Sequence, residues 1–198
     1  MLPKITFKYS YVYDRNWQEW FRVYKKTPQK LTPRQVQSYI KKIEKIWSKE
    51  RRAILQELAR VSKLKWKKKE ITCYVVSDCR PFSDPLTLPA YNNKEYFVDV
   101  LTHELIHQLF TQEGNHKKAK KAWEYFHKKY KKESHITRIH IPLYAIHSHV
   151  YKKLFNEERM ERDMYWIKFF PDYKKAWEIV KKDGYENILK ELSFRVEK

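Results

Sequence analysis

Glycine and cysteine are scarce in this chain, with two of each among 198 residues. Runs of about 18 consecutive apolar residues, the minimum for a membrane-spanning helix, are absent. The first residues, MLPKIT, lack the apolar core of a signal peptide. Cys73 and Cys79 have a spacing typical of neither a zinc knuckle nor a redox CxxC pair. We therefore expect a cytoplasmic protein without disulfides and with no membrane association.

Acidic residues are also few compared with basic ones. The chain has 43 Lys and Arg against 24 Asp and Glu, a net charge of +19. Clustered basic residues favour nucleic acid because they release counterions from phosphates. The lysines here are spread along the whole chain, which also fits a solvated surface, and high Lys and Glu content is typical of heat-adapted proteins. Non-specific nucleic-acid binding through the basic surface is therefore one expectation among others.

The motif His103-Glu104-Leu105-Ile106-His107 is the strongest chemical signal in the sequence. Residues four apart on a helix share one face, with Cβ atoms about 5–6 Å apart, so both imidazoles can bind one metal ion. Glu104 lies about 100° around the helix from His103, where its carboxylate can hold a metal-bound water. The surrounding residues are mostly apolar, which predicts a buried helix. Two buried histidines would be costly without partners, and one metal ion satisfies both.

This HExxH helix resembles the active-site helix of zincin metallopeptidases, in a gluzincin-like or minigluzincin-like form. The resemblance implies a hydrolase that uses zinc to activate water, with Glu104 as general base and a peptide or protein as substrate. The metzincin continuation HExxHxxGxxH is absent, because the first glycine after His107 is Gly114. A SprT-like protease, or a basic nucleic-acid-binding protein with a structural metal site, is the alternative.

A catalytic zinc site needs a third protein ligand, and the sequence leaves its identity open. His140 and His147 are seven residues apart and lie within about 20° of each other on a helix, beside an apolar stripe that should turn inward. These two histidines are the first candidates for the third ligand.

Other ligand candidates come from resemblance to related families and from residue type. Glu157, with Glu161 four residues later, resembles the ExxxD/E arrangement of gluzincins, in which the second acidic residue supports the ligand. His116, just after Gly114, superficially resembles the third histidine of SprT-like proteases. Cys73 or Cys79 would be the only choice if the ligand were a cysteine.

The order of predicted elements indicates an α+β fold. We expect a small mixed sheet packed on a backing helix and on the HExxH helix, followed by an all-helical C-terminal part. Residues 1–114 would form a zincin-type N-terminal subdomain, and residues 115–198 a helical subdomain that supplies the third ligand. The predicted strands are 5–14 and 71–77, and the predicted helices are 16–26, 32–64, 93–114, 117–132, 142–154, 159–169 and 172–194, the last with a break at Gly184.

Three finer expectations concern the active site. By resemblance to zincins, the extended segment from Pro85 to Tyr91 would be an edge strand that pairs with the substrate backbone. Tyr144, Tyr151 or a histidine that is not a metal ligand is a candidate for stabilising an oxyanion. Asp99, one turn before His103, could accept a hydrogen bond from its free ring nitrogen.

Overall fold

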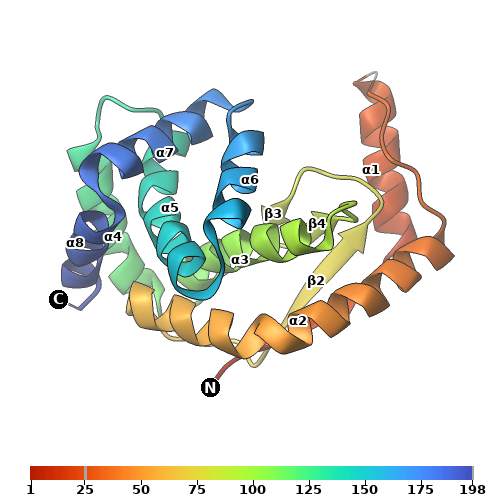
Figure 1. Cartoon of the computed structure of the whole chain (residues 1–198), viewed down its shortest axis with the longest axis horizontal. Helices are drawn as coiled ribbons and strands as arrows, with labels where there is room; N and C mark the ends of the chain where they lie inside the picture. The colour runs from red at the N-terminus through yellow and green to blue at the C-terminus, as the bar shows by residue number, and fades with distance from the viewer. Residues whose placement is uncertain (25, 198) are drawn as a thin grey trace. The chain divides into compact units, whose positions relative to one another are not determined.

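The computed structural model describes residues 1–24 and 26–197 of the chain. The protein is a mixed α+β structure with one small four-stranded sheet and a helical C-terminal part (Figure 1). The elements in chain order are β1 (Lys4–Lys8), α1 (Tyr11–Val23), α2 (Pro33–Ser62), β2 (Glu70–Val76), β3 (Phe82–Ser83), β4 (Leu86–Pro89), α3 (Lys94–Thr111), α4 (His116–Lys129), α5 (His135–Leu154), α6 (Glu157–Ile167), α7 (Pro171–Asp183) and α8 (Tyr185–Glu197).

The chain divides into two compact units, and two helices continue from one unit into the other. The first unit comprises Met1–Arg52 and Lys68–Leu105, and the second comprises Ala53–Lys67 and Ile106–Lys198. The division falls within α2, after Arg52, and within α3, after Leu105. The HExxH motif therefore lies on one continuous helix.

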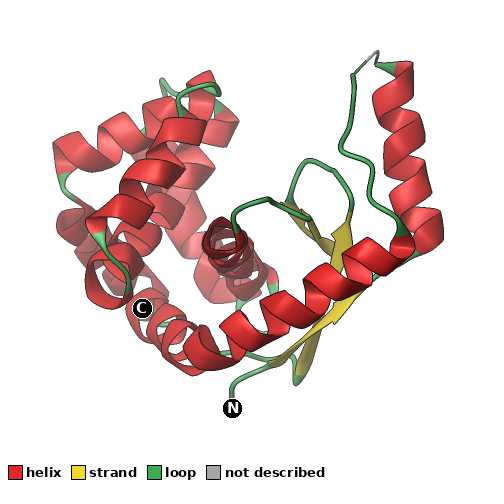
Figure 2. Ribbon diagram, turned by 45° about the vertical axis from the view of Figure 1, so that its right-hand side comes forward, coloured by secondary structure: helices red, strands yellow, loops and turns green. Residues whose placement is uncertain are grey.

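The strands of the first unit, yellow in Figure 2, form a sheet. Its strand order is β1-β2-β4-β3. Strands β1, β2 and β4 are parallel, and the two-residue strand β3 pairs with β4 in the antiparallel direction. In β2, Ile71, Cys73 and Val75 alternate with half-buried residues, so one face of the strand packs into the core. The expected mixed sheet is confirmed.

The predicted strand over residues 5–14 is wrong beyond Lys8. Ser10 accepts a hydrogen bond from the Tyr13 amide at 3.3 Å and caps helix α1. Asp14 is buried in that helix, where its carboxylate accepts hydrogen bonds from the Ser77 amide and hydroxyl, both at 2.8 Å. A helix cap and one buried carboxylate thus override the alternating pattern that favours a strand.

The prediction that Pro85 to Tyr91 forms an edge strand is also wrong. Strand β4, within the predicted Pro85–Tyr91 segment, lies between β2 and β3 and is buried along its whole length. Its partner β3 comes from the irregular stretch before it, where Phe82 pairs with Thr87. A two-residue strand gives too little pattern to be found by alternation, which explains the error.

Helix α2 begins as its sequence predicts. The Gln35 amide donates to the Thr32 hydroxyl at 3.3 Å, and the Thr32 amide donates back to the Gln35 side chain at 2.7 Å. This reciprocal capping box satisfies two amides that have no partner within the helix. Pro33, which needs no amide partner, is the first helical residue.

Helix α3 is buried on nearly all sides. Asn93 caps its start by accepting from the amides of Glu95 and Tyr96 at 2.9 and 3.1 Å. In the first unit, Phe97 packs against Phe7 of β1 and Tyr39 of α2, with ring centroids 6.0 and 5.8 Å apart. The sheet and the backing helix thus both contact α3.

The second unit is helical, and α5 is its central helix. Helix α5 contacts α4, α6, α7 and α8, and twelve of its twenty residues are buried. It starts seven residues before Pro142, the predicted beginning, because Ser134 caps it by accepting from the Thr137 amide at 3.1 Å. Pro142 lies inside the helix, where packing on all sides outweighs the loss of one backbone hydrogen bond. Among the described helices, none has the length and apolar character required to cross a bilayer.

Candidate metal centre

His103 and His107 lie on the one open stripe of helix α3. Between Phe97 and Phe110 every residue is buried except these two histidines, which are half-buried. Because they are one helical turn apart, their side chains leave the helix on the same side. The local pattern therefore leaves only the two imidazoles of this stretch accessible.

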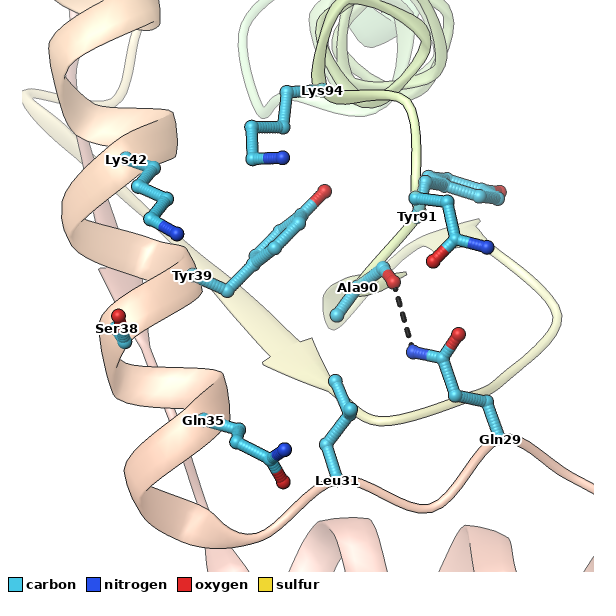
Figure 3. A pocket seen from close by; sticks show the side chains of 10 residues that line it. Gln29, Leu31, Gln35, Ser38, Tyr39, Lys42, Ala90, Tyr91 and Lys94 are labelled. Carbon is cyan, nitrogen blue, oxygen red and sulfur yellow. Dashed lines mark hydrogen bonds between the residues drawn. The ribbon is translucent and has the colours of Figure 1, made fainter.

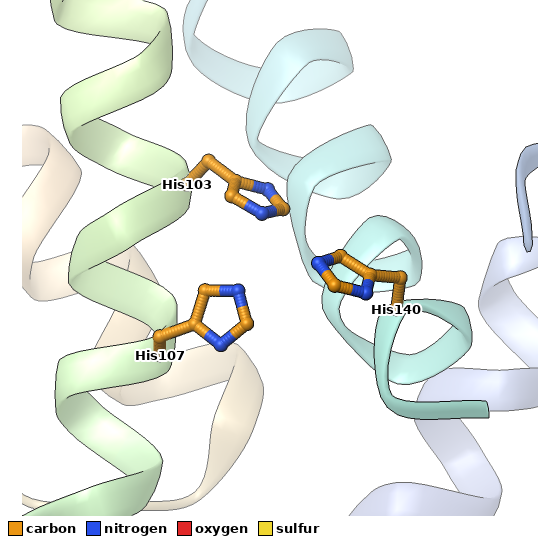
Figure 4. A group of neighbouring side chains, drawn as sticks. All are labelled: His103, His107 and His140. Carbon is orange, nitrogen blue, oxygen red and sulfur yellow. The ribbon is translucent and has the colours of Figure 1, made fainter. Parts of the chain in front are cut away.

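A third histidine, His140 of α5, joins this pair. The His103, His107 and His140 side chains each offer a ring nitrogen, and these nitrogens lie within 4.8 Å of one another (Figure 4). Within the second unit, the rings of His107 and His140 meet edge to face, with centroids 5.2 Å apart. Three nitrogens bound to one tetrahedral zinc at about 2.0–2.1 Å lie about 3.4 Å apart, so small side-chain rotations would close the group around an ion.

The ring of His140 is oriented by its own helix. Its Nδ1 lies 2.8 Å from the carbonyl oxygen of Ile136, which can only accept a hydrogen bond. The hydrogen is therefore on Nδ1, and Nε2 keeps its lone pair. Metal-binding histidines are commonly held in this way by a backbone carbonyl on the second nitrogen. His140 thus has the tautomer that a metal ligand needs.

The protonation state of His107 also suits metal binding. Burial, and next the neighbouring His140, lower the pKa of His107 to about 3. The imidazole is therefore neutral at physiological pH and does not need to lose a proton before binding. A group of three imidazoles fits Zn²⁺, which prefers nitrogen and sulfur ligands and leaves a fourth position open in catalytic sites.

Glu104 lies beside His103 and is buried, with 7% of its surface exposed. Burial raises the pKa of its carboxyl to about 8, and the positive charge of Arg80 opposes that shift. A carboxylate with a raised pKa accepts a proton more readily than an exposed one. Glu104 is thus a buried carboxyl that directly follows His103 on α3.

His147, the other histidine predicted from α5, lies outside the group among the described residues. Its ring is fully buried and stacks on Tyr151, with centroids 4.4 Å apart. Its Nδ1 lies 3.8 Å from a carboxylate oxygen of Asp163 in α6. Burial, and next the charge of Arg159, lower the pKa of His147 to about 3. Its surroundings are those of a neutral core residue.

The remaining ligand candidates do not join the described group either. His116 begins α4 and is exposed, and Glu157 and Glu161 lie on the exposed side of α6. Cys73 and Cys79 are buried free thiols, and burial raises the pKa of both, which disfavours the thiolate that binds metal.

Aromatic residues from two helices surround His140, and sequence reasoning found only one of them. Tyr144 was a candidate, and its ring lies 5.5 Å from that of His140. Tyr173 of α7 is closer, with centroids 4.4 Å apart, and Trp177 stacks on Tyr144 at 4.7 Å. Nothing in the spacing of Tyr173 marks it, because only the packing of α7 on α5 brings it there. Tyr151 stacks on His147 instead.

A separate pocket of about 400 Å³ lies in the first unit. The side-chain amide of Gln29 donates to the carbonyl oxygen of Ala90 at 3.1 Å (Figure 3). It also lies 3.3 Å from the carbonyl oxygen of Ser77, to which it donates. Lys94 at the start of α3 lines this pocket, and His103 lies nine residues later, roughly 14 Å along the helix axis. The pocket is lined by Gln29, Leu31, Gln35, Ser38, Tyr39, Lys42, Ala90, Tyr91, Asn92 and Lys94, and none of the three histidines belongs to it.

Fold and site together describe a mixed α+β protein whose buried HExxH helix contributes two histidines to a group of three. No protein-family model matches the chain, and neither a curated protein nor a solved structure matches it.

Proposed function

We propose that the protein is a zinc-dependent metallopeptidase with a zincin-like arrangement. The observation that carries the proposal is the convergence of three histidine nitrogens within 4.8 Å, with the buried Glu104 directly after His103 on α3. His103, His107 and His140 would hold the ion, and the fourth position would stay open for water or substrate. Three ligands and one adjacent base are the parts that metal-assisted hydrolysis requires.

The order of elements around the site supports the zincin-like part of the proposal. A parallel strand pair, a long helix behind it and a short antiparallel strand all precede the HExxH helix. The third ligand then comes from the helical part that follows. This order matches the zincin resemblance of the sequence, with histidine in the place of the gluzincin glutamate.

The chain's own residues have distinct roles in the proposed reaction. When bound, zinc supplies a Lewis acid that acidifies water and polarises the scissile carbonyl. Glu104 would accept the proton from water and return it to the leaving amine. The Nδ1–H bond to Ile136 keeps His140 in its binding orientation throughout.

The substitution Glu104→Gln tests this function. We expect untagged protein purified without chelator to hold one zinc per chain and to hydrolyse a fluorogenic casein. Glu104→Gln should keep that zinc but lower turnover by about 10²–10⁴, because a general base contributes that much. Glu158→Gln, an exposed residue of α6, is the matched control and should behave as wild type.

Two results would contradict the proposal. A zinc-loaded Glu104→Gln variant with full activity would exclude Glu104 as the base. Zinc-loaded wild-type protein that hydrolyses no denatured protein would leave a metal site without peptidase activity.

A further inference from the structure

Four large aromatic side chains are exposed together at the end of α6 and the turn into α7. Tyr165, Trp166, Phe169 and Phe170, here called the aromatic patch, are 54%, 49%, 60% and 53% exposed. Each leaves roughly half of the 150–250 Å² that an aromatic side chain can bury in contact with water. Exposed apolar surface of a few hundred Å² commonly marks a binding site.

Ring contacts within the second unit connect the aromatic patch to the proposed metal ligand. Phe170 contacts Tyr173, with centroids 5.9 Å apart, and Tyr173 contacts His140 at 4.4 Å. Phe169, the neighbour of Phe170, contacts both Tyr165 and Trp166, at 6.0 and 6.3 Å. Phe170 of the aromatic patch is therefore two ring contacts away from His140.

A positive charge lies against two rings of the aromatic patch. The Lys168 amino group lies 3.6 Å from the ring centroid of Tyr165 and 5.1 Å from that of Phe169. Residues 164–171 contain no acidic residue. The nearest acidic residue on the α7 side, Asp172, accepts a hydrogen bond from the Ser134 hydroxyl at 2.6 Å. The patch thus combines apolar rings with a cation, on a chain of net charge +19.

We infer that the aromatic patch binds the substrate, and that it selects peptide segments with a large apolar side chain next to an acidic one. The apolar side chain would pack on Phe169 and Phe170, and the carboxylate would pair with Lys168. This inference rests on the proposed peptidase function, because the substrate is what must approach His140. An extended peptide advances about 3.3 Å per residue, so the selected pair would lie within a few residues of the cleaved bond.

Binding of three labelled peptides tests the inference without cleavage. The zinc-loaded Glu104→Gln chain is titrated against fluorescein-labelled dodecapeptides and followed by fluorescence anisotropy. The first peptide contains two Phe and three Glu, the second has Ser for each Phe, and the third has Lys for each Glu. We expect the first to bind at least tenfold more tightly than the other two.

Two patch variants and a control make the test specific. The double variant Phe169→Ser with Phe170→Ser should lower the affinity for the first peptide tenfold or more. Lys168→Glu should reverse the preference between the Glu and Lys peptides. The control, Trp20→Ser with Tyr24→Ser, removes another exposed ring pair, on and just after α1, and should change affinity less than twofold. Circular dichroism establishes that each variant is folded.

Several outcomes would overturn the inference. Equal binding of the three peptides, or unchanged binding by the double Phe variant, would show that the patch does not select substrate. Binding to vesicles with 30% phosphatidylserine, lost in the double Phe variant while the peptides do not bind, would assign the patch to a membrane surface. Self-association that disappears in the same variant, again without peptide binding, would assign it to a second copy of the chain.

Failure of this inference and of the proposed function can be told apart. Selective peptide binding by a chain that never cleaves would keep the patch as a peptide site and reject the peptidase. The opposite outcome is cleavage with equal kcat/KM for the first two peptides, unchanged in the double Phe variant. It would support the peptidase function and reject substrate selection by the aromatic patch.

Discussion

His140 shows how one side chain completes the proposed metal site. Its Nδ1–H is held by the Ile136 carbonyl at 2.8 Å, and its ring lies against His107 and Tyr173. His147, seven residues later on the same helix, is buried against Tyr151 and Asp163. Burial alone does not distinguish these two histidines, but their neighbours do.

Substitution of each candidate residue in turn should show which one is the third metal ligand. We expect His140→Ala to weaken zinc binding at least 100-fold, because two histidines remain where three are needed. His116→Ala and Glu157→Ala, both exposed, should keep wild-type affinity. His147→Gln should also keep zinc, although it disturbs a buried stack. Metal content by mass spectrometry and competition with a zinc indicator measure the effect.

A zinc affinity lost in His147→Gln and kept in His140→Ala would contradict the proposed ligand set. Because a buried residue can unfold the chain when replaced, circular dichroism must accompany each measurement.

Glu57 is the centre of a cluster of charges between α2 and α5. Its carboxylate accepts hydrogen bonds from Arg60 Nε at 3.0 Å, His149 Nε2 at 2.6 Å and Lys153 Nζ at 2.9 Å. Burial alone would raise the pKa of Glu57, but the hydrogen bonds from Arg60, Lys153 and His149 outweigh it and lower the pKa to about 2. The folded state therefore favours the charged carboxylate.

Glu57→Gln should destabilise the protein in a pH-dependent way. Because the folded pKa of Glu57 is lowered, its contribution is complete above about pH 4.5 and disappears as the pH falls toward 2. We expect a loss of about 1–2 kcal/mol at pH 7, less than the full pKa shift implies, since Arg60 and Lys153 are about half exposed. Urea unfolding of both proteins at pH 7, 5 and 3 measures it. A difference that stays constant down to pH 3 would contradict the prediction.

At the scale of elements, several boundaries could be predicted because their signals are local. Thr32-Pro33 and Gln35 start α2 in the predicted place, since a capping box involves residues only three apart. Two other boundaries were predicted wrongly, because β1 ends at Lys8 and α5 starts at His135, before Pro142. In both places a contact with a distant residue, or a cap upstream of the pattern, determines the boundary.

The connection between α3 and α4 depends on Gly114. Its φ of +83° lies in the left-handed region, and an added Cβ would meet the Cε of Lys67 at 3.2 Å. We expect Gly114→Ala to cost roughly 1–2 kcal/mol, mainly from the backbone because the Lys67 side chain can move. Gly114→Asn should cost less, since asparagine tolerates this conformation better. Denaturant unfolding compares them, and equal stability of Gly114→Ala and wild type would refute the expectation.

At the scale of the whole molecule, the net charge of +19 predicts an attraction to polyanions. Its densest part is residues 117–132, with eight lysines and one acidic residue. We expect weak binding to a random-sequence DNA duplex, with log Kobs falling linearly with log salt. Lys117→Ala with Lys118→Ala should reduce that slope by about 0.9 for each phosphate contact removed. Fluorescence anisotropy between 50 and 300 mM NaCl measures the slope, and binding independent of salt would contradict the prediction.

The sequence by itself determined the features that depend on near neighbours along the chain. These are the shared face of His103 and His107, the place of Glu104 beside them, the start of α2 and the helical character of the second half. Helical periodicity and capping involve residues three or four apart, so they can be predicted without a fold.

Only the tertiary structure decided which residue joins His103 and His107. His140 and His147 share a helical face and are both buried, but different elements pack against them. The sequence separation between His107 and His140 is closed by packing of whole helices, which no local pattern encodes. The same packing brings Tyr173 to His140 and places β4 between β2 and β3, away from the sheet edge.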